Sequence, residues 1–569
     1  MKDNFVFRIR IIYILLFVFG LTILTRLFFV QVVRHDYYKE LANQQYFASP
    51  AQYFDRGSIF FKDKNGQLIS AAAIKEGFLL AINPKLIENP KEICDKLSQI
   101  IDLDKDLFFK SVDKKDDIYE EIAHKISREN GEEIKKLGLK GVNVYSERWR
   151  FYPGANLASR VLGFVGYNGD KLEGRYGLEK FYESVLGRGG EGEFIANSFA
   201  EIIMDIKKVI SGTSLKGDIV LTIDPEAQNF LENSLQATLE KYEAEMAGGL
   251  VIDPRTGKIL AMAVKPDFNP NYYGEEKDLS LFLNPITQNV FEMGSIMKPL
   301  TLAAALDQNK IIPETTYDDK GYVVLNNKRI ENYDAKARGV VNMQEVLNQS
   351  LNTGAVFVMQ KLGKEKFKEY IINYGLGEKT GIDLPDEITG LISNLDSGRD
   401  IEFATASFGQ GIAVTPIEMA AALSTLANGG ILMTPYVVEK IKPEEGIEKI
   451  TEKNERRQVL KKETSEEISR MLVRVVDEAL LGGIYKMEHY TVAAKTGTAQ
   501  ISGAREGGYS ESEYTHTFFG YAPAFDARFL TFLFLSKPQG VRYASHSLTE
   551  PFMNITKFLL NYYQVPPDR

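Results

Sequence analysis

Cysteine is nearly absent from this sequence, since Cys94 is the single thiol in a chain of 569 residues. One cysteine excludes an intrachain disulfide framework and any zinc site built from several thiolates. Histidine is also scarce, and none of the five histidines shows a metal-ligand spacing such as His-Glu-x-x-His. We therefore expect the histidines to be surface or packing residues, and we predict neither a metal site nor a cofactor.

Long runs of positive charge are missing as well. The formal net charge is −9 at pH 7, so no nucleic-acid-binding surface is expected. Hydrophobic residues make up 44% of the chain and charged residues 25%, proportions that are typical of a folded globular protein. A chain of 569 residues is too long for one ordinary hydrophobic core, which predicts several domains.

One long apolar run is present, and it lies near the N-terminus. Residues 11–25 carry no charge, and residues 27–33 continue the apolar pattern beyond Arg26. The uncharged part is shorter than the roughly 20 residues that cross a bilayer, but an arginine near one end can extend its side chain to the lipid headgroups. We predict a transmembrane anchor over residues 11–33, with a cleaved signal peptide as the alternative.

Basic residues on both sides of this run bear on its orientation. Lys2, Arg8 and Arg10 precede it, which favours a short cytoplasmic tail over residues 1–10 and an exported body. Basic residues on the far side weaken this bias. The predicted localisation is therefore a single pass through the cell (inner) membrane, with the rest of the chain outside the cytoplasm.

Residues 35–215 contain no combination of side chains that suggests catalysis. Residues 59–69 are typical of a β-hairpin, and residues 85–137 are charged and helix-prone. The small polar residues at 211–214, together with Lys216 and Gly217, predict a linker. We therefore predict that one domain ends here and that a second domain covers residues 218–569.

The second predicted domain has strands near both of its ends. Helical patterns separate these strands and also close the chain, at residues 225–242 and 550–563. Strands from the two ends that join in one antiparallel sheet beside helices predict an α+β fold. The predicted strands are residues 218–223, 249–252, 259–263, 517–521 and 529–535.

A serine and a lysine lie three residues apart near the middle of the chain. Ser295 and Lys298 precede Pro299, which lacks an N–H group and is tolerated only in the first turn of a helix. Ser295 is therefore predicted at a helix N-terminus, with Lys298 beside it on the same face. This pair is a candidate nucleophile and base. Alone the pattern is weak, because a capping serine and a solvated lysine fit it better.

Two later motifs change that interpretation. Ser350-Leu351-Asn352 lies on a second predicted helical segment, and Lys495-Thr496-Gly497-Thr498 follows the strand-like residues 490–494. The order S-x-x-K, S-x-N, K-T-G is the signature set of the penicillin-binding proteins and serine β-lactamases. Over roughly residues 218–563 the chain resembles the transpeptidase domain of the class B penicillin-binding proteins.

The resemblance extends to the region before the linker. Four segments follow the order found in the pedestal of class B members, which implies an elongated α+β pedestal over residues 35–215 that contacts partners. With the N-terminal anchor the likeness runs nearly end to end, and it is somewhat closer to septal, division-type members than to elongation-type ones. The four segments are Asp55–Gly57, Arg148–Gly154, Leu162–Gly166 and Gly177–Lys180.

This resemblance implies a membrane-anchored peptidoglycan D,D-transpeptidase. Such an enzyme cross-links stem peptides that end in D-Ala-D-Ala through a serine acyl-enzyme. Ser295 would be the nucleophile, and Lys298 the base, its pKa lowered by burial and by the second cation, Lys495. Ser350 would relay a proton to the departing D-alanine, and Asn352 would hold Lys298 and the substrate amide.

Substrate binding is expected along the K-T-G-T segment. Lys495 would attract the terminal carboxylate of the donor, and the hydroxyls of Thr496 and Thr498 would hydrogen-bond it. Gly497 has no side chain, so the donor could lie edge-on against this segment. By analogy with the family, the backbone N–H groups of Ser295 and Thr498 would form the oxyanion hole.

Partners and rival functions complete the expectations. β-Lactams would mimic the donor and stop at the acyl-enzyme. No glycosyltransferase module is apparent, and the resemblance implies a SEDS-type glycosyltransferase and other membrane proteins of division or elongation as partners. Two alternatives stay open, namely a D,D-carboxypeptidase or β-lactamase-type hydrolase that uses the same residues, and a non-catalytic scaffold of the division machinery.

Overall fold

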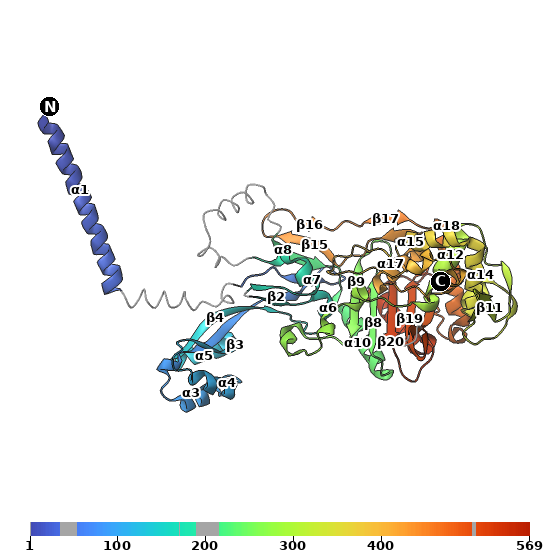
Figure 1. Ribbon diagram of the computed structural model, residues 1–569, viewed down its shortest axis with the longest axis horizontal. Coiled ribbons are helices and arrows are strands. Elements are labelled where there is room, and N and C mark those ends of the chain that lie inside the picture. Colours follow the sequence, from blue (N-terminus) through green and yellow to red (C-terminus); the bar gives the residue numbers. More distant parts are fainter. Residues whose placement is uncertain (1, 35–53, 170, 189–215, 503–507) are drawn as a thin grey trace. The chain divides into compact units, whose positions relative to one another are not determined.

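The computed structural model describes most of the chain, and Figure 1 shows it as a ribbon. The described residues are 2–34, 54–169, 171–188, 216–502 and 508–569. Residues 211–214 of the predicted linker lie outside them, whereas Gly217, also assigned to the linker, is the first residue of a strand. The chain divides into two compact units, the first comprising Met1–Asp55, Ile74–Trp149 and Gly189–Asn197, and the second comprising Arg56–Ala73, Arg150–Arg188 and Ser198–Arg569.

The N-terminal apolar run forms one long helix. It consists of α1 (Lys2–Phe28) and a π-helical turn, η1 (Phe29–Val33). Its stretch Tyr13–Val33 has 21 residues and a mean hydropathy of 2.2, so it is long and apolar enough to cross a membrane. The hydroxyls of Thr22 and Thr25 donate to carbonyls one turn earlier, so these polar groups are satisfied within the helix.

The first unit also holds a small antiparallel sheet with helices beside it. Strand β2 pairs with both β3 and β4. Apolar side chains of the strands and helices form one core, which includes Phe78, Leu80 and Phe108. The elements are β2 (Leu68–Ile82, which begins in the second unit), η3 (Pro84–Leu86), α3 (Pro90–Leu97), α4 (Lys105–Val112), β3 (Glu120–Ile126), α5 (Arg128–Lys136) and β4 (Val142–Phe151).

Strand β3 departs from the sequence expectation for this unit. Residues 85–137 were interpreted as helix-prone, but Glu120–Ile126 within them form a strand. Ile122 and Ile126 of this strand are buried in the core of the unit. Pairing with β2 and burial of these two β-branched residues therefore outweigh the helix propensity of the surrounding charged residues.

A second sheet begins the larger unit. The predicted hairpin at residues 59–69 is confirmed as β1 (Ile59–Lys62) paired antiparallel with β2, and Gly66 in its turn has a φ of 84°. Strand β1 also pairs in parallel with β7 (Gly217–Leu221), which carries β15 (Val438–Pro443) and then β16 (Lys449–Ile450) on its other side.

Buried charges gather beside this sheet. Glu179 accepts hydrogen bonds of 2.6 Å from both Arg56 and Arg150, and Tyr152 donates to the same carboxylate. All four side chains are at least nine-tenths buried. Three of the segments that carry the pedestal resemblance therefore meet in one ion-paired cluster. The short elements around it are α6 (Ser159–Leu162), β5 (Val165–Asn168), β6 (Lys171–Gly174), α7 (Gly177–Phe181) and α8 (Glu183–Leu186).

The main sheet of the larger unit has five antiparallel strands in the order β18-β19-β20-β8-β9. Its strands come from both ends of the region, as the sequence predicted, and the α+β fold class is confirmed. Strand β18 stands at one edge of the sheet, next to β19. The strands are β8 (Met246–Ile252), β9 (Ile259–Lys265), β18 (Ala493–Ser502), β19 (Tyr509–Ala522) and β20 (Phe529–Ser536).

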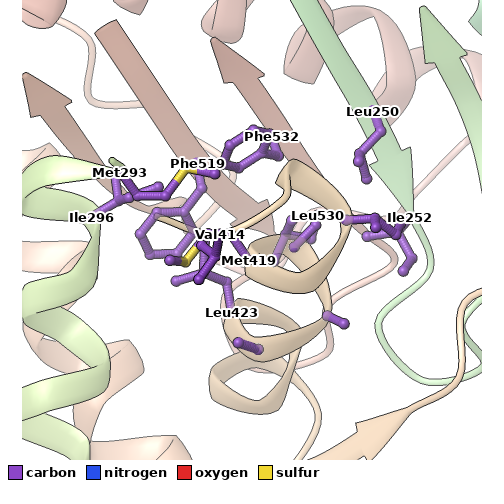
Figure 2. Packing of buried hydrophobic residues seen from close by; sticks show 14 of the residues in the cluster. Leu250, Ile252, Met293, Ile296, Val414, Met419, Leu423, Phe519, Leu530 and Phe532 are labelled. Carbon is purple, nitrogen blue, oxygen red and sulfur yellow. The ribbon is translucent and has the colours of Figure 1, made fainter. Parts of the chain in front are cut away.

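Helices cover both faces of this sheet. On one face α10 (Pro225–Lys241) and α20 (Thr549–Tyr562) pack over β8 and β19. Their bounds lie within one residue of the predicted helices at 225–242 and 550–563. On the other face Figure 2 shows Phe519 and Phe532 packed with Met293, Ile296 and Met419. The whole of β20 is buried, with Phe532 and Phe534 on one face and Leu533 and Leu535 on the other.

The segment between the early and late strands is mostly helical. Its centre is α12 (Lys298–Asp307), which is buried at almost every position. The other helices of this segment are η5 (Pro270–Glu275), η6 (Leu279–Phe282), α11 (Pro285–Gln288), η7 (Gly294–Met297), α13 (Met343–Asn348), α14 (Asn352–Leu362), α15 (Lys364–Asn373), η8 (Ser393–Asp396), α16 (Asp400–Ala406), α17 (Pro416–Ala427), α18 (Lys462–Arg474), η9 (Val475–Ala479) and η10 (Leu480–Gly483), and the short α19 (Ala544–Ser547) follows β20.

Three small two-stranded sheets lie in the same segment. Strands β10 and β13 pair with each other, as do β11 and β12, and β14 and β17. The first two pairs lie between α12 and α13 in the chain and flank the turn that carries the S-x-N motif. Their bounds are β10 (Thr316–Asp319), β11 (Tyr322–Leu325), β12 (Lys328–Glu331), β13 (Gly339–Asn342), β14 (Ile431–Met433) and β17 (Glu455–Gln458).

Candidate active site

Ser295 lies in a tight turn that packs against strand β18. The turn, η7, leads directly into α12, whose first turn contains Pro299. Gly294 has a φ of 61°, and a Cβ atom added to it would lie 3.0 Å from the carbonyl carbon and oxygen of Thr498. Only a glycine allows this turn to approach β18 so closely. Ser295 therefore stands at the N-terminal end of a helix, as the position of the proline predicts.

Lys298 is completely buried beside Ser295, with a side chain 0% exposed. Its Nζ lies 2.9 Å from the Oγ of Ser295, 2.8 Å from the Oδ1 of Asn352 and 2.5 Å from the carbonyl oxygen of Ser350. The Oγ of Ser350 is also within hydrogen-bonding distance, at 3.1 Å. Burial, and then the charge of nearby Lys495, hold the pKa of Lys298 well below its usual value.

These contacts direct the lone pair of the Lys298 amine. A neutral amine has two N–H donors and one lone pair. The carbonyl of Ser350 and the Oδ1 of Asn352 can only accept, so they take the two N–H groups; the Nδ2 of Asn352 faces the carbonyl of Glu331 instead. The lone pair is left for a hydroxyl proton, and the Oγ of Ser295 is the nearer of the two hydroxyl oxygens.

Ser350 is not on a helix, which corrects the sequence expectation. It lies between α13 and α14, and its φ of 55° is left-handed backbone that a helix cannot contain. In this conformation both its carbonyl and its hydroxyl face Lys298. Non-glycine residues with positive φ are uncommon and cost free energy, and such positions often occur at functional sites.

Lys495 is the second buried amine of the site. Its side chain is 3% exposed, and its Nζ donates to the Oγ of Ser350 at 3.1 Å and to the carbonyl of Thr496 at 2.9 Å. Burial lowers the pKa of Lys495 to about 7. The hydroxyl of Ser350 therefore bridges the two lysines, each 3.1 Å from it.

The K-T-G-T motif lies inside strand β18 and does not follow a strand, which is a second correction. The strand begins at Ala493, and Gly497 pairs with Thr517 of β19. A Cβ at Gly497 would lie 2.3 Å from the hydroxyl of Thr517 and 2.7 Å from the carbonyl of Met293. Glycine therefore also serves to pack the strand against the turn that carries the serine.

Thr498 has one hydrogen-bonding role already filled. Its Oγ1 accepts a hydrogen bond of 3.1 Å from the backbone N–H of Ala544, so its own proton is free for another partner. The neighbouring strand places His516 opposite Thr498. His516 is fully buried between the hydroxyl of Ser547 and the carbonyl of Arg542, and burial lowers its pKa to about 4. The imidazole is thus neutral and holds the segment that contacts Thr498.

All the predicted site residues come together in one place. Direct hydrogen bonds connect five of them, and the other three follow Lys495 along β18, beside the turn that carries the nucleophile. Contacts made by main-chain atoms were not foreseen, such as those from Glu331, Gly409 and Ala544. Main-chain groups carry no sequence signal, so only the fold could show them. The five connected residues are Ser295, Lys298, Ser350, Asn352 and Lys495.

Comparison with known proteins gives matches over most of the chain. Residues 247–557 match the penicillin binding protein transpeptidase domain, and residues 52–217 match the penicillin-binding protein dimerisation domain. Stage V sporulation protein D of Bacillus subtilis is 34% identical over 553 residues, which cover 95% of this chain and 83% of that protein.

Two further similarities have the same extent. The probable peptidoglycan D,D-transpeptidase PenA of Neisseria gonorrhoeae is 26% identical over 566 residues, which cover 99% of this chain and 94% of that protein. The crystal structure of penicillin-binding protein 3 from Mycobacterium tuberculosis, complexed with aztreonam, matches with a TM-score of 0.69 at 23% identity. That match covers 91% of this chain and 98% of the crystallised one, and it shows the shared fold.

Proposed function

This chain belongs to the class B penicillin-binding proteins, which are serine-type peptidoglycan D,D-transpeptidases, and on that premise we propose how its residues share the work of cross-linking. The observation that carries the proposal is the buried Lys298 amine, which has two pure acceptors on one side and the Ser295 hydroxyl on the other. This arrangement suits a neutral lysine that accepts the proton of a nucleophilic serine.

In the first half of the reaction, the Oγ of Ser295 attacks the carbonyl carbon between the two D-alanines of a donor stem. Its proton passes to the Nζ of Lys298 as the new C–O bond forms. The backbone N–H groups of Ser295 and Thr498 stabilise the oxyanion. When the C–N bond breaks, the leaving amine takes a proton through the hydroxyl of Ser350, which lies between Lys298 and Lys495.

In the second half, the amine of a neighbouring stem attacks the acyl carbon. Its excess proton returns through the same lysine and serine hydroxyl, and the ester bond to Ser295 breaks to regenerate the enzyme. Lys495 and the hydroxyls of Thr496 and Thr498 hold the terminal carboxylate of the donor. The edge position of β18 supports this assignment, because an extended peptide can add to an open sheet edge.

Membrane attachment and partners form a separate part of the proposal. We propose that α1 anchors the chain by a single pass in the cell membrane, with the catalytic unit outside the cytoplasm. The length and hydropathy of Tyr13–Val33 support an anchor, and the basic residues before it support this orientation. A SEDS-type glycosyltransferase is the proposed supplier of uncross-linked glycan, since the reaction assigned here joins peptides only.

β-Lactams provide the test of the catalytic assignment. Membranes that contain the full-length chain are labelled with a fluorescent penicillin, and mass spectrometry locates the modified residue. We expect the label on Ser295, and we expect no labelling of Ser295→Ala or Lys298→Ala. Labelling that persists in Ser295→Ala would overturn the assignment. An acyl-enzyme that survives for hours excludes the β-lactamase-type hydrolase, whereas release within seconds would favour it.

A further inference from the structure

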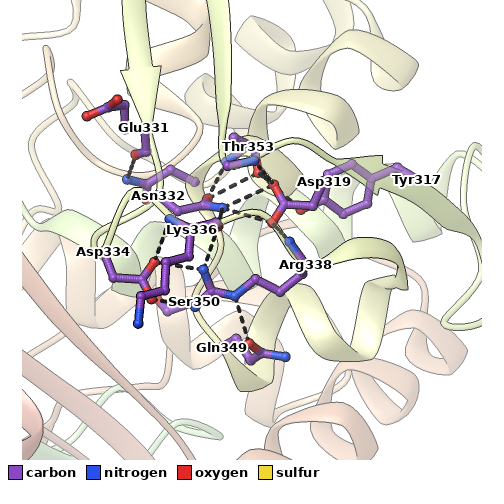
Figure 3. Close-up of polar contacts among 12 residues, drawn as sticks. Tyr317, Asp319, Glu331, Asn332, Asp334, Lys336, Arg338, Gln349, Ser350 and Thr353 are labelled. Atoms are coloured by element: carbon purple, nitrogen blue, oxygen red, sulfur yellow. Dashed lines mark hydrogen bonds and ion pairs between the residues drawn. The ribbon is translucent and has the colours of Figure 1, made fainter.

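A buried asparagine lies directly behind the S-x-N turn. Asn332 follows strand β12 and is 3% exposed. Its Oδ1 accepts the backbone N–H of Thr353 at 3.2 Å, and its Nδ2 lies 3.1 and 3.0 Å from the two carboxylate oxygens of Asp319. Figure 3 shows this side chain between the aspartate and the threonine. The S-x-N motif itself does not contain any of these three residues.

The orientation of the Asn332 amide follows from its partners. A backbone N–H can only donate, so the Oδ1 must face Thr353. The carboxylate of Asp319 and the carbonyl of Lys336 only accept, so the NH₂ group must face them. An aspartate at position 332 would place a carboxylate oxygen against these acceptors. Asparagine, unlike aspartate, therefore satisfies every one of these contacts.

Asp319 is the shared acceptor in this group of residues. Its carboxylate is 1% exposed and accepts from the hydroxyl of Thr353 at 2.7 Å and from the backbone N–H groups of Gly321 and Arg338 at 3.0 Å. Together with Asn332 these donors satisfy both oxygens of a buried charge. A buried carboxylate with several hydrogen bonds holds its partners rigidly, because leaving any of them unpaired is costly.

Glu331 and Asn332, at the end of β12, hold Asn352 and Thr353, at the start of α14. The carbonyl of Glu331 accepts the Nδ2 of Asn352 at 2.8 Å, and the Oδ1 of Asn332 accepts the N–H of Thr353. The first contact sets the rotation of the Asn352 amide, and the second fixes the backbone that carries it. The Oδ1 of Asn352 consequently points at the Nζ of Lys298, 2.8 Å away.

We propose that Asn332, held by Asp319, is a positioning residue for the catalytic lysine. It acts through the backbone of Thr353, which keeps the Oδ1 of Asn352 and the carbonyl of Ser350 on the two N–H groups of Lys298. With both acceptors in place, the lone pair of the amine stays directed at Ser295. The inference rests on the proposed function, since it assigns to Asn332 the geometry that makes Lys298 a base.

The first test measures the second-order rate constant of acylation by a fluorescent penicillin in the full-length chain. Asn332→Leu keeps the size of the side chain and removes its hydrogen bonds. We expect acylation to slow about 10- to 100-fold, because small displacements of a catalytic group have effects of that size. Lys328→Ala is the matched surface control, because it removes an exposed side chain of β12 that makes none of the hydrogen bonds around Asn332; its rate should equal that of the wild type.

A second control separates positioning from loss of stability. Ile330→Ala truncates a buried side chain of β12 without touching the hydrogen bonds around Asn332. We expect Ile330→Ala to lower the melting temperature, because the truncation leaves a cavity. Its acylation rate should stay within about threefold of the wild type, because the hydrogen bonds of the site are kept. If Ile330→Ala slows acylation as much as Asn332→Leu does, the effect is one of stability and the proposal is wrong.

The pH profile provides a readout that a purely structural role would not change. In Asn332→Leu the loosened turn admits water to Lys298, so the acid limb of the acylation profile should move to higher pH. In Asn332→Asp, protonation of the new carboxyl at low pH restores a donor toward Asp319. The rate of this variant relative to the wild type should therefore improve as the pH falls, and that of Asn332→Leu should not.

The outcomes separate this inference from the proposed function. If the wild type is not acylated, or if Lys298→Ala is acylated normally, the proposed function fails. If Lys298→Ala is inactive but Asn332→Leu matches the wild type in rate and pH profile, the proposed function stands and the positioning role of Asn332 is excluded.

Discussion

Two buried polar clusters in the larger unit differ in what surrounds their basic side chains. In the cluster around Glu179, a carboxylate lies 2.6 Å from each of two arginines. In the active site, the hydrogen bonds of Lys298 and Lys495 go to hydroxyl, carbonyl and amide oxygens. Within the described residues neither lysine is paired with a carboxylate. Burial is similar in both clusters, so the presence or absence of a counter-charge sets their chemistry.

The pKa values follow this difference. Burial alone would lower the pKa of Arg56, but Glu179 and Glu183 raise it above its usual value. Burial alone would raise the pKa of Glu179, but the two arginines hold it below its usual value. Arg56 and Glu179 therefore stay ionised. Lys298 has no counter-charge, so burial and the charge of Lys495 lower its pKa and favour the neutral amine that accepts a proton, whereas burial alone lowers the pKa of Lys495 to about 7.

The largest effect is expected from Lys298→Met, which keeps the length of the side chain and removes the amine. Acylation by a fluorescent penicillin should fall by at least about 1000-fold, because a serine without its base is a poor nucleophile. The melting temperature should change little, since the hydrogen bonds lost with the amine are offset by replacing a buried group that has no counter-charge with an apolar side chain. A variant that keeps the wild-type acylation rate would show that another group accepts the proton of Ser295.

The opposite pattern is expected from Glu179→Gln in the ion-paired cluster. This change leaves two buried guanidinium groups without their shared counter-charge, which costs about 3–5 kcal/mol of unfolding free energy. Denaturant or thermal unfolding measures the loss, and acylation per folded molecule should be unchanged. Glu76→Gln is the control, because its ion pair with Arg148 is exposed and contributes little. Equal stability of the two variants would show that the counter-charge of Glu179 does not stabilise its cluster.

An intermediate effect is expected from Thr498→Val. The valine keeps the shape of the threonine but cannot donate to the carboxylate of the donor. The loss of one hydrogen bond to a charged group lowers the second-order acylation rate about 10- to 100-fold. Val492→Thr, at a buried position before β18, tests whether any polar change near the strand has this effect. A wild-type rate in Thr498→Val would show that the carboxylate is held by other groups.

The sequence predicted the chemistry of the site better than its local backbone. The proposed nucleophile and both lysines could be singled out because their residue types and spacing suit the chemistry, and the structure brings them together. The left-handed φ of Ser350 was not, since nothing in a Ser-Leu-Asn segment distinguishes a helical turn from this one. The strand predicted before the K-T-G-T motif ended too early, at residue 494, because Gly497 and its threonine neighbours resemble turn residues. Only pairing with β19 makes them part of β18.

The same limit applies to the fold as a whole. The main sheet was predictable, because its strands have runs of apolar and β-branched residues near both ends of the region. Strand β3 was not, because its charged residues form a strand only when β2 is beside them. The role inferred for Asn332 also depends on contacts that bring residues 319, 332 and 353 together, and no local sequence pattern predicts these contacts.

The smallest expected effect is a pH dependence that comes from Lys495. Burial lowers the pKa of Lys495 to about 7, so the side chain loses its charge as the pH rises through 7. The neutral amine no longer attracts the donor carboxylate, so acylation by a penicillin should fall about fivefold between pH 7 and pH 8. Below this range the rate also falls, once Lys298 takes up a proton and cannot act as a base.

Two controls show whether Lys495 causes this basic limb. A penicillin methyl ester has no carboxylate, so its slower acylation should lack the decline above pH 7. Lys495→Arg keeps a positive charge at every accessible pH, and its residual acylation should lack the decline as well. If the decline persists in both experiments, a group other than Lys495 titrates. The uncompensated burial of this amine would then have no bearing on how the enzyme captures its donor.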